Sequence, residues 1–216
     1  MGQYDPIVLV GSLLLLSLAP FIVMMTTSYV KLVVVLSLVR NALGVQQVPP
    51  TMVLNGLGLI LSVFIMAPVM YETWELMEKA NITKVPSPSE MVAVGNKIKG
   101  PFKAFLVKHA DEHSTEFFLK TAKRLWPQKQ AVALQKDDLA ILIPAFTVSE
   151  LTRAFEIGFL LYLPFIALDL VISNILLAMG MMMVSPMTIS LPFKLLLFVL
   201  IDGWSKLIQG LVLSYR

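Results

Sequence analysis

The chain has 216 residues, of which 57% are hydrophobic and only 14% charged, and its mean hydropathy is +0.79. These values are typical of a membrane-associated protein that forms one structural unit with room for a small insert. The absence of cysteine excludes disulfides, thiolate zinc sites and cysteine nucleophiles. The net charge is only +3, and the basic residues form no stripe of the kind that nucleic-acid binding needs.

Long charge-free runs predict the hydrophobic helices. They are residues 6–30, 41–71 and 170–193, and each is long enough for a helix to cross a hydrocarbon layer. Shorter apolar stretches follow at residues 139–149, 157–168 and 195–216. We expect about four hydrophobic helices in an all-α fold of membrane-associated helical hairpins. The first run follows "MGQYD", which lacks the positive segment of a cleaved secretory signal, so this helix is expected to be retained.

Residues 72–138 form a soluble insert, because they hold 11 of the 17 basic and 9 of the 14 acidic side chains. The predicted domains are therefore residues 1–71, 72–138 and 139–216. Ser87, Pro88 and Glu90 have the spacing of a helix start with a capping box, and Gly100 with Pro101 is expected to break the helix. The insert should thus consist of short helices.

The side of the membrane on which the insert lies can be predicted only from the distribution of charge. Lys31 and Arg40 favour a cytoplasmic first loop, whereas the acidic "YETWELMEK" opens the insert on the other side. This pattern predicts an extracytoplasmic insert.

Catalytic and metal-binding patterns are weak. His109 and His113 are four residues apart on a predicted helix, but Ala110 stands where a zinc-protease motif needs Glu, so a solvated polar face is favoured over a metal site. The sequence contains no G-x-S-x-G, P-loop or dinucleotide-binding glycine pattern. We expect no catalytic residues, no metal and no cofactor.

Charges within apolar sequence are more informative, since a charged group at membrane depth costs about 2.5 to 3.5 kcal/mol unless it finds a partner or water. Asp169 is the only charge between residues 157 and 193, and Lys194 follows directly. An ion pair between them is favoured over a proton relay at Asp169. Glu150 and Arg153 are three residues apart, and two readings remain open: a self-satisfied patch, or contact with a neighbouring subunit.

Met181, Met182 and Met183 are consecutive and lie between Gly180 and Pro186. Glycine and proline at these positions predict that the segment leaves regular helix and forms a loop or tight bend. Methionine is flexible and polarizable, so these side chains could fill irregular gaps in one copy or, repeated around a pore, form a soft apolar collar.

Three long segments together are similar to one family. They are "TSYVKLVVVLSLVRNALGVQQVPP" from Thr27, "PAFTVSELTRAFEIGF" from Pro144 and "LPFIALDLVISNILLAMGMMMVSPMTISLPFKLLLFVLIDGW" from Leu163. The chain resembles the FliP/SctR (YscR-like) family, the R component of the type III secretion export apparatus. The start of the chain lacks the signal that flagellar members carry, which makes it more similar to the injectisome branch used in virulence.

The resemblance implies an oligomer with the S and T export-apparatus subunits, which are FliQ-like and FliR-like. Together they would form a helical cone in the bacterial inner membrane, much of it on the periplasmic side, through which unfolded secreted proteins pass. The family's methionine loop falls on Met181, Met182 and Met183, the expected pore gasket, and its acid and lysine fall on Asp169 and Lys194.

The predicted function is therefore a non-enzymatic subunit of a protein-export channel. The alternatives are a proton-coupled transporter subunit using Asp169 and Glu150, and an intramembrane protease. The sequence has no internal inverted repeat of the transporter kind, and no paired catalytic acids or activated serine.

Overall fold

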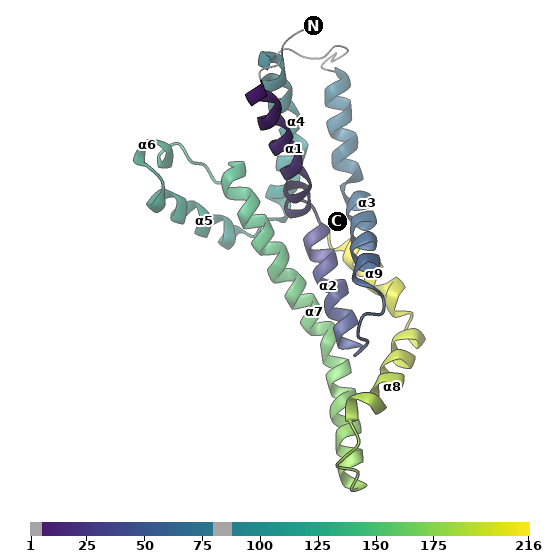
Figure 1. Cartoon of the computed structure of the whole chain (residues 1–216). Coiled ribbons are helices and arrows are strands. Elements are labelled where there is room, and N and C mark those ends of the chain that lie inside the picture. The colour runs from purple at the N-terminus through teal and green to yellow at the C-terminus, as the bar shows by residue number, and fades with distance from the viewer. Residues whose placement is uncertain (1–5, 80–87) are drawn as a thin grey trace. The chain divides into compact units, whose positions relative to one another are not determined.

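The computed structural model describes residues 6–79 and 88–216, and it confirms an all-α fold for them (Figure 1). The described residues form nine helices and no strand. The helices are α1 Pro6–Thr26, α2 Tyr29–Ala42, α3 Thr51–Lys79, α4 Pro88–His109, α5 Glu112–Leu125, α6 Gln128–Ala131, α7 Leu139–Ala178, α8 Pro186–Leu200 and α9 Gly203–Leu213.

Two of these helices, α3 and α7, are long and apolar enough to cross a membrane. The count rises to four if the pair from Pro20 to Ala42 and the pair α8 and α9 each form one broken span. Helices α8 and α9 meet at an angle of 61°. Only 22% of the most apolar window of α3 and 17% of that of α7 is buried within the chain, so both helices leave apolar surface for lipid or for other subunits.

The chain divides into two compact units, each made of separate stretches of sequence. One unit contains residues 1–30 and 69–149, and the other contains residues 31–68 and 150–216. The three-part domain division made from the sequence stays a prediction.

The core of the second unit is built around α2. Leu32, Val35, Leu36 and Val39 recur at helical spacing and are buried, which identifies the face that α2 turns to the core. Phe165 of α7 and Phe198 of α8 join the same cluster. The helices α2 and α7 approach closely at Gly158, because a Cβ atom there would overlap the side chain of Leu38. Glycine at this position therefore permits the packing distance.

The first unit has its own core, in which Phe105 of α4 packs against Phe146 of α7 with ring centroids 5.7 Å apart. Leu106 and Ile141 are also buried there. The Thr147 hydroxyl donates to the carbonyl of Met25 at 3.0 Å and thereby joins α7 to the end of α1.

Two local predictions about helix α4 have different outcomes. The predicted break at Gly100 and Pro101 is wrong, since α4 continues through both residues. An interior proline costs a helix about 3 kcal/mol, and the core packing of Phe105 and Leu106 later in α4 opposes this cost. Helix α4 begins at Pro88, and the capping role of Ser87 falls outside the described residues.

The single helix expected to carry both His109 and His113 is also wrong, and so is the solvated polar face favoured there, because His109 is buried. His109 ends α4, where it is buried against the Phe105 ring, while His113 is exposed on α5. Asp111 separates the two helices, because its side chain accepts a hydrogen bond from the Ser114 N–H and caps α5.

The two basic residues that favoured a cytoplasmic first loop are not in a loop. Lys31 and Arg40 both lie within α2 rather than in a loop, and Lys31 is buried. The rule that basic loops face the cytoplasm applies to residues in loops, so the buried Lys31 gives no information on which side of the membrane a loop lies.

Candidate functional site

The methionine loop, residues 179–185, connects α7 to α8 and reverses the direction of the chain (Figure 1). Gly180 has a φ of 71°, its N–H donates to Leu177, and the N–H of Met181 donates to Leu176. These two hydrogen bonds form a helix-ending motif that requires a left-handed residue, and glycine adopts that conformation without strain. Pro186 then starts α8. The predicted bend between Gly180 and Pro186 is confirmed.

The three methionines of the loop are exposed to an increasing degree. The exposed fractions are 43% for Met181, 81% for Met182 and 101% for Met183. Three consecutive exposed methionines do not fill gaps in the core of this chain, so their apolar side chains are available to something outside it. The bend therefore presents methionine at a tip rather than packing it.

Asp169 and Lys194 are brought together by α7 and α8. The Lys194 Nζ atom lies 2.7 Å from Asp169 Oδ2, and the lysine is buried. The hydroxyl of Ser190, one turn before Lys194, donates to Asp169 Oδ1 at 2.6 Å. The two carboxylate oxygens thus have separate partners.

Lys194 has a second partner that could not be predicted from the sequence. Its Nζ also donates to the carbonyl oxygen of Ala42 at 3.2 Å, at the last residue of α2. A helix C-terminus carries partial negative charge and unpaired carbonyls, so it favours a cation. Lys194 of α8 therefore connects the C-terminal end of α2 to the interior of α7.

Glu150 lies in a second buried cluster, in which three residues from different parts of the described chain contact its carboxylate. Lys31 Nζ is 3.4 Å from Oε2, Arg153 Nη1 is 3.5 Å from Oε1, and the Tyr215 hydroxyl donates to Oε2. The Lys31 ammonium also lies 3.5 Å from the centroid of the Tyr215 ring, within the range of a cation–π interaction. Glu150 and Lys31 are almost completely buried, whereas Arg153 is 40% exposed.

The sequence analysis did not identify Lys31, Tyr215 or Ser190 as members of these clusters. Lys31 had a usable signal, since it is the only charge between residues 6 and 39. A lone charge in so apolar a stretch calls for a partner. Tyr215 and Ser190 had no such signal, because neither residue type is unusual near an apolar helix.

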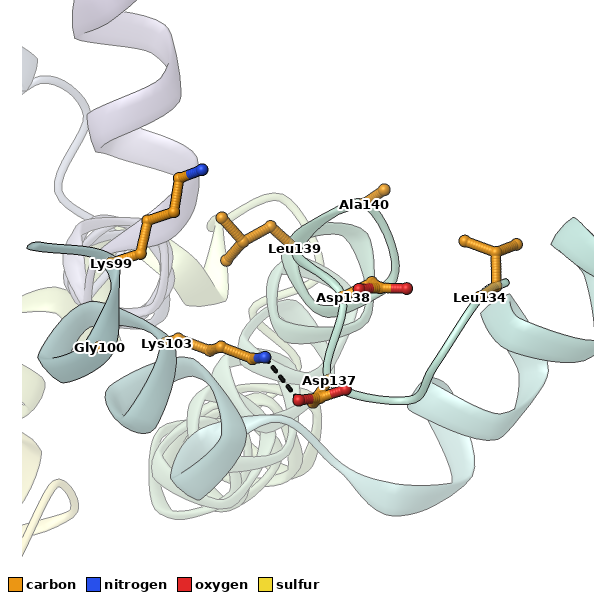
Figure 2. Close-up of a pocket in the computed structure, with 8 residues that line it drawn as sticks. All are labelled: Lys99, Gly100, Lys103, Leu134, Asp137, Asp138, Leu139 and Ala140. Carbon is orange, nitrogen blue, oxygen red and sulfur yellow. Dashed lines mark hydrogen bonds and ion pairs between the residues drawn. The ribbon is translucent and has the colours of Figure 1, made fainter. Parts of the chain in front are cut away.

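A groove of about 470 Å³, lined by two lysines, two aspartates and four uncharged residues, lies between α4 and the segment that leads into α7 (Figure 2). Lys103 Nζ and Asp137 Oδ2 lie 2.5 Å apart at its edge. This ion pair lowers the pKa of the Asp137 carboxyl, chiefly through the hydrogen bond from Lys103. The groove is open, and its charges neutralise one another, so it is a connection between elements rather than a binding site.

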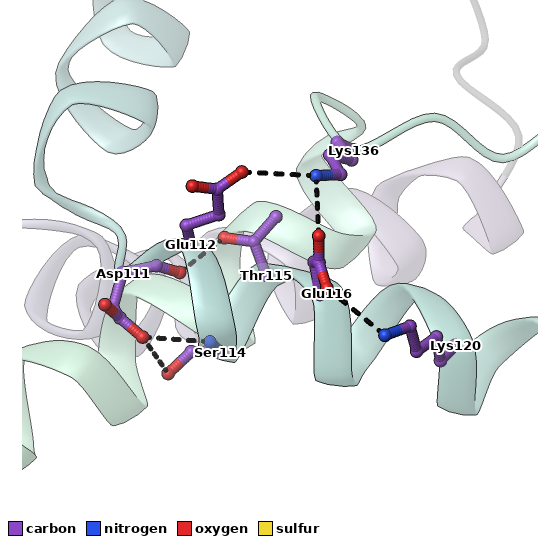
Figure 3. Close-up of polar contacts among 7 residues, drawn as sticks. All are labelled: Asp111, Glu112, Ser114, Thr115, Glu116, Lys120 and Lys136. Atoms are coloured by element: carbon purple, nitrogen blue, oxygen red, sulfur yellow. Dashed lines mark hydrogen bonds and ion pairs between the residues drawn. The ribbon is translucent and has the colours of Figure 1, made fainter.

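A neighbouring group of ion pairs attaches the same segment to α5 (Figure 3). Lys136 lies 3.0 Å from Glu116 and 3.4 Å from Glu112, and Lys120 lies 3.2 Å from Glu116. The hydrogen bond with Lys136 is the main reason that the pKa of Glu116 is lowered, and the same contact raises the pKa of Lys136. Adjacent residues of opposite charge, Lys136 and Asp137, thus bind two different helices. None of the described residues forms a cluster of His, Asp and Glu that could hold a metal ion.

The chain is similar to known proteins over nearly all of its length. Residues 12–211 match the model of the FliP family. The Yop proteins translocation protein R of Yersinia pestis is 57% identical over 213 residues, which are 98% of this chain and 97% of that protein. The virulence protein YscR of Salmonella typhimurium is 52% identical over 212 residues, with the same coverage of both chains. The hypersensitivity response secretion protein HrcR of Ralstonia nicotianae is 51% identical over 202 residues, or 93% of each chain.

Proposed function

The chain belongs to the FliP family, and from this premise we propose that it is a subunit of the export gate of a bacterial type III secretion system. In this role it lines a channel through which unfolded proteins cross the inner membrane. The observation that carries the proposal is the methionine loop, which presents Met182 and Met183 almost fully exposed at the turn between two apolar helices. Similarity over at least 93% of the chain to relatives named for translocation and secretion supports it.

The channel is an oligomer in this proposal. Several copies of the chain assemble with the S and T subunits, which are FliQ-like and FliR-like, into a helical cone that projects to the periplasmic side. The low burial of α3 and α7 supports such an assembly, because subunit contacts and lipid together would cover the apolar surface that the single chain leaves open. Arg153, which remains 40% exposed beside the buried Glu150, is the side chain of that cluster best placed to contact a neighbouring subunit.

The loops from several copies would form the gasket of the gate. A ring containing Met181, Met182 and Met183 excludes water and ions at rest, as hydrophobic constrictions do. During export the same unbranched side chains deform around a passing chain of any sequence without binding it strongly. Branched or aromatic side chains would adapt less well.

Asp169 and Lys194 have a structural role in this account. Both Asp169 oxygens accept hydrogen bonds, from Lys194 and Ser190, and Glu150 is held by Lys31, Arg153 and Tyr215. The transporter alternative uses Asp169 and Glu150 as proton carriers, and carboxylates fixed in ion pairs are poorly suited to exchanging protons. The structural role is thus better supported.

Native mass spectrometry of the complex purified with its neighbouring subunits tests the proposal. The expected result is several copies of this chain together with two other hydrophobic subunits, stable in detergent. A functional monomer, or a small homo-oligomer that contains no other subunit, would contradict the channel.

A further inference from the structure

The segment from the end of α5 through α6 exposes large apolar side chains outside any predicted span. We call residues 117–132 the α5–α6 corner. Leu125 and Val132 are 76% and 80% exposed, and Phe117 and Trp126 are exposed as well. Exposed apolar residues that gather in one short segment mark a contact surface, whereas scattered ones do not.

The same corner is strongly basic. It holds four basic residues and no acidic one, although the insert as a whole has nearly balanced charge. Lys120 is paired with Glu116. Lys123, Arg124 and Lys129 are exposed, and within the described parts of the chain they form no ion pair. The acidic residues of α5 lie in its first half, where they bind Lys136 (Figure 3).

Helical geometry puts both kinds of side chain on the outside of the first unit. Thr115 and Ala122 are buried and define the inner face of α5. Phe117 and Arg124, seven residues apart, share the opposite face. Trp126 is the C-cap of α5: its backbone N–H donates to the Ala122 carbonyl, and its side chain is exposed at the turn into α6.

An anionic bilayer surface is the partner that fits both features. Tryptophan is enriched where the hydrocarbon meets the headgroups, because its ring is apolar and its N–H is polar. Lysine and arginine beside it match the phosphates of anionic lipids. We propose that the α5–α6 corner docks on a phosphatidylglycerol-containing membrane surface, with Leu125 and Trp126 inserted at the headgroup level.

The chain connections allow this contact. Only six residues separate Val132 from Leu139, where the apolar helix α7 begins, so the corner lies close in the chain to a helix that is apolar enough to cross a membrane. The docking requires only that the chain resides in a membrane. It is therefore independent of the proposed channel, and either idea can fail without the other.

The natural absence of cysteine makes a direct test possible in the full-length chain. Leu125→Cys carries a single environment-sensitive fluorophore, and His113→Cys, an exposed site about 18 Å away along α5, is the matched control. Each protein is reconstituted into vesicles of phosphatidylcholine alone or with phosphatidylglycerol, and nitroxide-labelled lipids serve as the quencher. The charge-reversal variant combines Lys123→Glu, Arg124→Glu and Lys129→Glu. Its control reverses three basic residues elsewhere: Lys79, Lys108 and Lys206.

We expect at least twofold stronger lipid quenching at position 125 in phosphatidylglycerol vesicles than in phosphatidylcholine, with no such change at position 113. Each basic residue near an anionic surface favours the contact roughly fivefold, so the reversal at the corner should abolish the difference and the control reversal should preserve it. Equal quenching at both positions, or insensitivity to headgroup or to the corner reversal, would overturn the proposal. Shielding of position 125 from lipid that arises only with co-assembled subunits would identify a protein contact and overturn it as well.

Discussion

Lys31 and Glu150 are almost completely buried, and the Nζ atom of the lysine lies 3.4 Å from Oε2 of the glutamate. They come from helices α2 and α7, and Tyr215 covers both with its ring and hydroxyl. Two charges that leave water together are stable only while each retains its partner. This buried cluster therefore connects α2, α7 and the end of the chain in the second unit, and its stability depends on all three side chains.

Removing one charge of this pair should destabilise the chain. Lys31→Met leaves the Glu150 carboxylate buried without its ammonium, which costs about 3 to 5 kcal/mol. Tyr215→Phe keeps the ring beside Lys31 and removes one hydrogen bond, which costs about 1 to 3 kcal/mol. Thermal unfolding in detergent, with Lys206→Met as the exposed control, measures the order. A Lys31→Met variant as stable as the control would contradict the claim that the Lys31–Glu150 pair stabilises the second unit.

Exchanging the charges of Asp169 and Lys194 tests the other buried pair. Asp169→Lys and Lys194→Asp each place two like charges at one site, so both should lose assembly and secretion. The double exchange should recover only part of the activity, because the lysine at position 169 no longer reaches the Ala42 carbonyl. Secretion is measured together with the amount of chain in the membrane. No recovery in the double variant, with both single variants normally abundant, would count against direct pairing.

The ion pairs of Lys136 and Asp137 should make the attachment of residues 132–138 to α4 and α5 sensitive to acid and to salt. The pKa values of Glu116 and Asp137 are lowered by their lysine partners, so their contribution is fully present above the ordinary carboxyl pKa and is lost as pH falls through the lowered value. The raised pKa of Lys136 means that its contribution persists at neutral pH and is lost only as pH rises through that raised value.

Hydrogen exchange of residues 132–138, corrected for the intrinsic effect of pH, measures this opening. Exchange should be faster at pH 3 than at pH 7, and faster in high salt at pH 7, because these pairs are exposed and screened. Glu116→Gln combined with Asp137→Asn should remove most of the difference. Exchange that depends on pH equally in this double variant would place the cause elsewhere.

Local patterns in the sequence predicted what depends on near neighbours. Charge-free runs indicated the long apolar helices, and Gly180 and Pro186 indicated the bend that holds the methionines. The pairing of Asp169 with Lys194 could be anticipated because no other charge competes with them in that stretch. The contacts of Lys31 and Tyr215 could not, since they depend on how α2, α7 and the end of the chain come together.

The errors have the same origin. The continuation of α4 through Gly100 and Pro101 depends on tertiary packing, in which Phe105 and Leu106 of the same helix are buried. His109 and His113 lie on different helices because Asp111 caps the start of α5. The four-residue spacing of the histidines suggested one continuous helix, so the cap was not predicted. Both units combine stretches distant in sequence, which no local composition reveals.

Shortening the three loop methionines should open a leak through the resting gate. Replacing Met181, Met182 and Met183 with alanine removes exposed side chains, so folding and assembly should be retained while small ions cross the inner membrane when secretion is idle. The control replaces Met52 and Met70, two exposed methionines of α3. Ion flux in cells that contain the complete complex is the measurement. A membrane as tight as with the native protein would contradict the gasket.

Capture of a substrate in transit tests the channel most directly. A photo-crosslinking amino acid at position 182 is combined with an export substrate whose passage is arrested by a tightly folded domain, and position 74, an exposed tryptophan of α3, serves as the control site. The account predicts crosslinks to the arrested substrate from position 182 and none from position 74. Crosslinks only to lipid or to other subunits from position 182, in complexes shown to hold the arrested substrate, would contradict the proposal that this loop surrounds the exported chain.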